Sequence, residues 1–140
     1  MILVDTNVIS ELMRAEPSSV VLSWFGTQDP SALFLSAITE AELCTGVSIL
    51  PMRQRRERLM AAIDAPINED FDGRVLPFDS RAAKSYAAIA AACRAAGRPI
   101  ADADCQNTAI ALGVGARIAP RNDKDFEGCS VPVINPWDAP

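Results

Sequence analysis

The sequence predicts an α/β fold in which a mainly parallel β-sheet is flanked by α-helices. Short apolar runs of strand type alternate along the chain with longer segments of helical periodicity, a pattern typical of sheets covered on both faces. The first run, Ile2–Val4, is apolar throughout, as expected of a buried strand. With 140 residues the chain has room for one core, so residues 1–140 are expected to form a single domain.

In the first half of the chain, prolines, glycines and capping residues predict where the elements begin and end. A helix follows the first strand directly, and another fits residues 17–26, opened by a proline and closed by a glycine. Residues 33–35 form the next predicted strand. Thr39 and Glu42 have the spacing of a capping box, with Thr39 as the N-cap of a helix that ends before Pro51.

The second half of the chain repeats this alternation. Pro77 indicates a strand that lies at the edge of the sheet or ends early, because proline cannot donate to a strand ladder. Asp79 is suited to cap the alanine-rich helix that follows. The predicted elements are, in order, a polar loop at 67–73, a strand at 75–78, a helix ending before Gly97, a helix from about Asp102 to Leu112 with Gly113 as its stop, and strands at 117–119 and 132–134.

The composition excludes several chemistries. The chain has 13 basic and 18 acidic residues, a net charge of −5, and is therefore a poor general binder of phosphate backbones. It contains no histidine, which excludes Ser-His-Asp and Cys-His nucleophiles and histidine-ligated zinc. Hydrolysis would have to rely on carboxylates, whose hard oxygen ligands favour Mg²⁺ or Mn²⁺.

The cysteines and the N-terminal sequence predict a cytoplasmic location. The start of the chain has neither a basic segment nor a long apolar run, so we expect no signal peptide and no membrane span. Scattered cysteines without a C-x-x-C pair are typical of reduced, mostly buried thiols, and here they are Cys44, Cys93, Cys105 and Cys129.

Asp5 is the first candidate for a functional acid. It follows the first strand, and parallel sheets bind ligands beyond the carboxyl ends of their strands. Its structural alternative is the N-cap of the next helix. Glu42 is a second candidate, although the third position of the capping box is by itself a sufficient reason for a glutamate.

Further acids open the last helix and the last loop. Asp102 and Asp104 lie two residues apart at a helix start, so at most one of them should face a shared site. Asp123 and Asp125 lie in a polar turn with Asn122, where side-chain turns are the ordinary explanation.

The functional hypothesis rests on these acids as a set, because one rim of the sheet could hold Asp5, Glu42, Asp104 and Asp125 together. Closely packed carboxylates repel one another, and a divalent cation removes that penalty. The four arginines at 53–58 are either a solvated helix face or a surface for phosphate or an acidic partner segment.

Five sequence blocks resemble PIN-domain toxins of the VapC and FitB type. They are MILVDTNVISEL at 1–12, SAITEAEL at 36–43, GRPIADAD at 97–104, RNDKDF at 121–126 and VINPW at 133–137. The blocks stand in family order and cover nearly the whole chain. The resemblance implies a PIN-like three-layer fold and an Mg²⁺- or Mn²⁺-dependent endoribonuclease, the toxin of a type II toxin–antitoxin pair.

The resemblance also implies roles for individual residues. Asp5, Glu42 and Asp104 match the acidic triad of the family, and Asp5 and Asp104 match its usual metal ligands. Asp102 has no counterpart and is placed outside the site. The fourth acid is expected at Asp125, or at Asp123, because Asn122 stands where some members have an aspartate; Arg121 beside them is the candidate for contact with RNA.

The partners implied by the resemblance are an RNA substrate, a cognate antitoxin and a second copy of the chain in a homodimer. DNA would be bound only through the antitoxin. One alternative is a covalent aspartyl-phosphate enzyme, although Asn7 stands where such enzymes usually carry a second aspartate. Another is a non-catalytic PIN-like partner of an antitoxin in a DNA-binding repressor complex.

Overall fold

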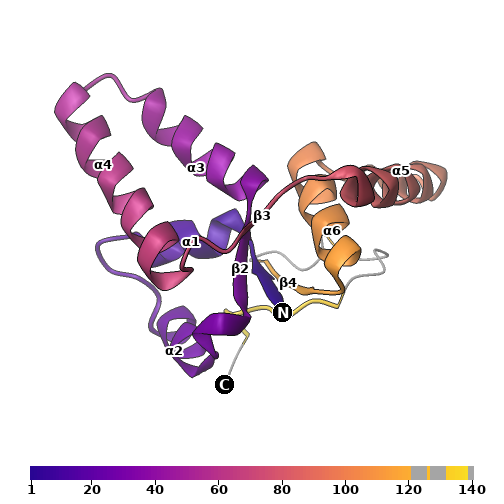
Figure 1. Cartoon of the computed structure of the whole chain (residues 1–140), viewed down its shortest axis with the longest axis horizontal. Helices are drawn as coiled ribbons and strands as arrows, with labels where there is room; N and C mark the ends of the chain where they lie inside the picture. Colours follow the sequence, from indigo (N-terminus) through magenta and orange to yellow (C-terminus); the bar gives the residue numbers. More distant parts are fainter. Residues whose placement is uncertain (121–125, 127–131, 139–140) are drawn as a thin grey trace.

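The computed structural model describes residues 1–120, 126 and 132–138, and its centre is a parallel β-sheet (Figure 1). The strand order is β3-β2-β1-β4, and each adjacent pair is parallel. An isolated parallel bridge between Ile118 and Val133 lies beside the last strand. The strands are β1 (Ile2–Val4), β2 (Leu33–Ser36), β3 (Val75–Leu76) and β4 (Arg117–Ala119).

Helices connect the strands, as the alternating sequence pattern predicts. In the described part of the chain they are α1 (Thr6–Leu12), α2 (Ser19–Thr27), α3 (Ala37–Ser48), α4 (Arg53–Ala65), α5 (Ser80–Ala95) and α6 (Asp102–Val114), with short helical turns at Pro30–Ala32 and Pro66–Asp70. None of these helices has the length and apolar character needed to cross a membrane.

The sheet separates two apolar layers, which makes the fold a three-layer α/β fold as predicted. Successive side chains of a strand point to opposite faces. Ile2 and Val4 pack in one core with residues of α1, α2, α3 and α4, whereas Leu3 packs in the other with Ile110 of α6 and Ala82 of α5. Figure 1 shows the same division, with α5 and α6 on one side of the strands and the α3–α4 hairpin on the other.

The topology brings the carboxyl ends of the strands together, because in a parallel sheet these ends all lie at the same edge. The chain passes from β1 through β2 to β3 on one side and returns to β4 on the other, so the strand order reverses at β1. Ligands bind at such a reversal in open α/β sheets. Asp5 lies there, and its backbone N–H donates to the carbonyl of Ala119 at 3.1 Å.

The predicted capping box at the start of α3 is wrong. Ser36, not Thr39, is the N-cap, and its hydroxyl accepts the backbone N–H of Thr39 at 3.0 Å. The helix therefore begins immediately after β2, three residues earlier than predicted. Glu42 lies in the second turn, where no capping role explains it.

Two helix boundaries that were predicted from the positions of glycine and proline are also wrong. α2 begins at Ser19, after the proline, and continues through Gly26. α6 likewise continues through Gly113, and it ends at Gly115, whose φ of 69° is the left-handed conformation that favours glycine. A glycine marks a helix end only where the backbone has to reverse its handedness.

The predicted polar loop at 67–73 also differs from the structure. The segment begins as a helical turn, and two of its apolar side chains, Ile67 and Phe71, are buried in the core under α4. Two neighbouring predictions are confirmed. The strand that precedes Pro77 is the edge strand β3, and the Asp79 side chain caps α5 by accepting the N–H of Ala82 at 2.9 Å.

The two helix starts at Asp79 and Ser18 provide a matched test of capping. Asp79→Ala removes the cap of α5 and should lower the free energy of unfolding by about 1 kcal/mol in urea titrations. Ser18→Ala changes an N-cap residue without a side-chain cap hydrogen bond, and it should cost less than about 0.5 kcal/mol. Equal losses in the two variants would contradict the assigned cap.

Candidate active site

Asp5 is a buried acid that does not use its side chain to cap a helix. The residue is 5% exposed and precedes α1, yet its carboxylate makes no side-chain cap hydrogen bond. Its oxygens instead accept amide hydrogens from two asparagines. Asn107 Nδ2 donates to Oδ1 at 3.3 Å, and Asn7 Nδ2 donates to Oδ2 at 3.4 Å. The described hydrogen bonds of this carboxylate therefore come from side-chain amides and not from a helix cap.

The surroundings of Asp5 favour its protonated form. Its pKa is raised from 3.8 to about 6, chiefly by burial and next by the negative charge of Asp104, with a smaller contribution from Glu42. The backbone N–H groups of Thr6 and Asn7 act in the opposite direction. The fold thus brings the three predicted acids into electrostatic contact around Asp5, while their catalytic roles stay a prediction.

Glu42 reaches the site from α3 and is exposed to solvent. The Thr6 hydroxyl lies 2.9 Å from Glu42 Oε1 and 3.0 Å from the hydroxyl of Thr39. An ionised carboxylate only accepts, so the single Thr6 proton goes to Glu42, and Thr39 then donates to Thr6. This relay connects α1 with α3 and fixes one oxygen of Glu42.

Of the two acids at the start of α6, only Asp104 acts on Asp5. Asp104 is half-buried, and its charge is the largest electrostatic contribution to the raised pKa of Asp5. Asp102 is exposed and accepts the hydroxyl of Tyr86 at 3.3 Å, and its negative charge raises the pKa of that tyrosine. The prediction that the two acids diverge, with Asp102 outside the site, agrees with this geometry.

The donor set fits a hard cation that retains part of its water shell. Within residues 1–120, 126 and 132–138, no three His, Cys, Asp or Glu side chains form a group that could hold a metal. Mg²⁺ commonly binds through one or two carboxylates and keeps several waters. Asp5 and Asp104 supply such a pair, and their mutual repulsion is the kind of penalty that a cation removes.

The other predicted site residues lie outside the described residues. These are Arg121, Asn122, Asp123 and Asp125. The positions proposed for the fourth acid and for contact with RNA therefore stay predictions.

The sequence did not predict the buried polar network that Ser36 and Asn107 form next to Asp5. Ser36 and Asn107 are 0% and 1% exposed, and the Ser36 hydroxyl donates to Asn107 Oδ1. Asn107 could have been noticed as an amide among the small apolar residues of α6. Its partner Ser36 could not, because it lies 71 residues away in the chain.

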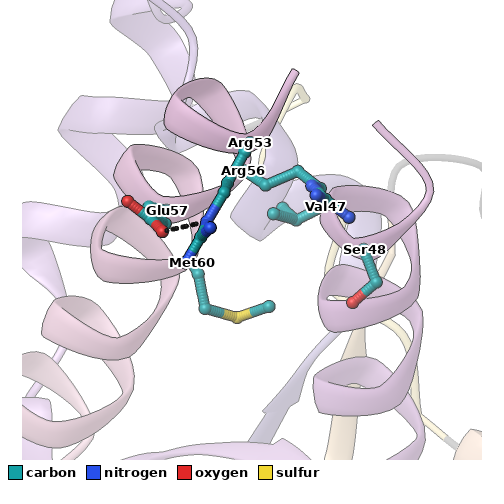
Figure 2. Close-up of a pocket in the computed structure, with 6 residues that line it drawn as sticks. All are labelled: Val47, Ser48, Arg53, Arg56, Glu57 and Met60. Atoms are coloured by element: carbon teal, nitrogen blue, oxygen red, sulfur yellow. Dashed lines mark hydrogen bonds and ion pairs between the residues drawn. The ribbon is translucent and has the colours of Figure 1, made fainter. Parts of the chain in front are cut away.

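The arginines of α4 are remote from this acidic site. Two of them, Arg53 and Arg56, border a pocket at the far end of the α3–α4 hairpin, which is also lined by Val47, Ser48, Glu57 and Met60 (Figure 2). Arg53 Nε donates to Glu57 Oε1 at 3.1 Å, and both side chains are mostly exposed. This solvated i,i+4 pair agrees with the simpler interpretation of the arginine run.

Comparison with known proteins places this arrangement in a family. The PIN domain family model matches residues 2–130. VapC ribonuclease Y4jK of Sinorhizobium fredii is 41% identical over 99% of both chains, and toxin FitB of Neisseria gonorrhoeae is 39% identical over 98% of this chain and 99% of that one. The solved structure of FitAB bound to an IR36 DNA fragment superimposes with a TM-score of 0.91 at 37% identity, covering 100% of this chain and 98% of that chain. The chain therefore belongs to the PIN-domain family, among its VapC- and FitB-like members.

Proposed function

We propose that this protein is a metal-dependent endoribonuclease and the toxin component of a type II toxin–antitoxin system. The observation that carries the proposal is the buried carboxylate of Asp5, which lies at the switch point of the sheet beside two further acids. Full-length relatives named VapC ribonuclease and toxin FitB support the same function. The absence of histidine leaves metal–carboxylate chemistry as the route to phosphodiester hydrolysis.

Each acid has a proposed role. Asp5 and Asp104 would hold Mg²⁺ or Mn²⁺, which when bound supplies the positive charge that activates water and stabilises phosphoryl oxygens. Glu42 orients or deprotonates the attacking water. Its exposure gives it access to solvent, and the bond from Thr6 to Oε1 holds the carboxylate in place. Asp125 completes the acidic set, and Arg121 contacts the RNA.

The proposed partner is an antitoxin. The similar FitAB structure contains DNA, and the solved structures that resemble this chain include toxin–antitoxin complexes. A net charge of −5 disfavours direct contact with a phosphate backbone, so DNA binding is assigned to the antitoxin. The toxin itself is proposed to form a homodimer and to act in the cytoplasm.

The alternative function is that of a PIN-like subunit that only binds an antitoxin within a DNA-binding repressor complex. Incubation of purified protein with RNA separates the two functions. Cleavage that requires Mg²⁺ and is lost with EDTA supports the nuclease, whereas intact RNA under all metal conditions supports the binding subunit.

Asp5→Asn should abolish cleavage and stabilise the fold. Loss of a proposed metal ligand should reduce the rate by at least about 100-fold, since even outer partners of metal ligands contribute 10–100-fold. At pH 7 without metal, the same change removes an unfavourable buried charge and should raise the free energy of unfolding by up to about 3 kcal/mol. Cleavage assays and urea titrations measure the two effects.

The matched control for this variant is Asp102→Asn, which changes an acid of the same size at the start of α6 but outside the site. It should retain activity within about threefold. Full activity of Asp5→Asn, or equal losses in both variants, would contradict the assignment.

Metal should stabilise the protein more at pH 7.5 than at pH 5. A folded-state pKa of about 6 against 3.8 means that the folded protein binds a proton more tightly than the unfolded chain, so the cost of Asp5 burial diminishes as pH falls from about 6 to about 4. A proton and a cation then compete for the same carboxylate. Thermal denaturation with and without Mn²⁺ should give the larger rise in Tm at pH 7.5, and Asp5→Asn should remove the difference.

A further inference from the structure

We infer that Asn107 is a positioning residue for the proposed metal ligands Asp5 and Asp104, and that Ser36 sets the orientation of its amide. The inference rests on the proposed function and assigns a role to side chains outside the acidic set. Asn107 and Ser36 are buried, with 1% and 0% of each residue exposed. A substrate cannot reach them, so they act through Asp5.

The hydrogen bonds that link Thr39, Ser36, Asn107 and Asp5 form a chain in which each donor and acceptor can be assigned. The backbone N–H of Thr39 donates to Ser36 Oγ at 3.0 Å, which leaves the hydroxyl proton of Ser36 for Asn107 Oδ1. With its oxygen engaged in this way, the Asn107 amide must present Nδ2 to Asp5 Oδ1, at 3.3 Å. The amide of Asn107 is therefore oriented by the start of α3.

A reversed amide would be unfavourable beside the ionised carboxylate of Asp5. It would place Asn107 Oδ1 against that carboxylate, and neither group would then have a proton to donate. At the other end, the hydroxyl proton of Ser36 would lose Asn107 Oδ1, its acceptor among the described hydrogen bonds. Buried groups that lose a hydrogen bond destabilise the fold, so the observed orientation of the amide is favoured.

This contact also sets the position of Asp104. Asn107 follows Asp104 by three residues on α6, so both side chains lie on one face of the helix. The bond from Asn107 to Asp5 thus fixes α6 against the end of β1, and with it the separation of the two proposed ligands. A neutral amide does this without adding a further negative charge to the acidic site.

The inference predicts a loss of metal affinity when the network is cut. Partners of metal ligands typically contribute 10–100-fold to affinity, and Asn107→Ala should weaken Mn²⁺ binding to the full-length protein by that factor. Electron paramagnetic resonance titration of free Mn²⁺ measures binding without an activity assay. Ser36→Ala should reduce affinity in the same direction, because it leaves the Asn107 amide without its orienting donor.

Two controls separate positioning from general loss of stability. Ile110→Val alters a buried side chain of the same helix that packs in the α5–α6 core layer. It should keep Mn²⁺ affinity within about twofold while lowering the midpoint of urea unfolding. Ser36→Thr retains a hydroxyl that can serve as an N-cap, and it should recover most of the affinity lost in Ser36→Ala.

The outcomes distinguish the inference from the proposed function. A wild-type protein that binds no Mn²⁺ and cleaves no RNA would overturn the proposed function and the inference with it. Wild-type Mn²⁺ affinity in a folded Asn107→Ala, or in a folded Ser36→Ala if the former does not fold, would overturn the inference alone. Equal losses in Ser36→Ala and Ser36→Thr would also overturn it, because the hydroxyl would then have no role.

Discussion

An ionisable carboxylate placed in a buried position beside other acids is the constraint on which this molecule depends. Burial and the charges of Asp104 and Glu42 all disfavour the ionised form of Asp5. The backbone N–H groups of Thr6 and Asn7 oppose this effect, but they leave its pKa near 6. A site with this unbalanced negative charge is suited to a cation, and the surrounding elements are arranged to maintain it.

The parallel sheet explains why this arrangement can exist. Because β1 lies between β2 and β4, the end of β1 is covered on both sides by the carboxyl ends of its neighbours. Ser36 ends β2 and also begins α3, so one residue terminates a strand, caps a helix and supports Asn107. The strands, which are only two to four residues long, mainly serve to bring these ends into register.

The parts of the site that were predictable are those defined locally. Asp5 follows an unmistakable buried strand, and the two-residue spacing of Asp102 and Asp104 predicts that they diverge. The cap of α3 was not predictable from its pattern. Ser36 and Thr39 are both good N-cap residues, and only Thr39 is followed by the glutamate of a capping box. The pairing of Ser36 with Leu76 in β3 decides between them, since it fixes where β2 ends. The role of Asn107 was not predictable for the same reason, because it depends on partners that are far away in the chain.

The corrected cap changes the interpretation of Glu42 as well. Without a capping role, its described hydrogen bond is to Thr6 of α1, a tertiary contact that holds an exposed carboxylate at the rim of the site. Asp5 and Glu42 therefore occupy opposite environments, one buried and one solvated. In a protein without histidine, a carboxylate that solvent can reach is well suited to accept a proton from water. This difference supports the proposed division of roles, in which the buried acid holds the cation and the exposed acid handles the water.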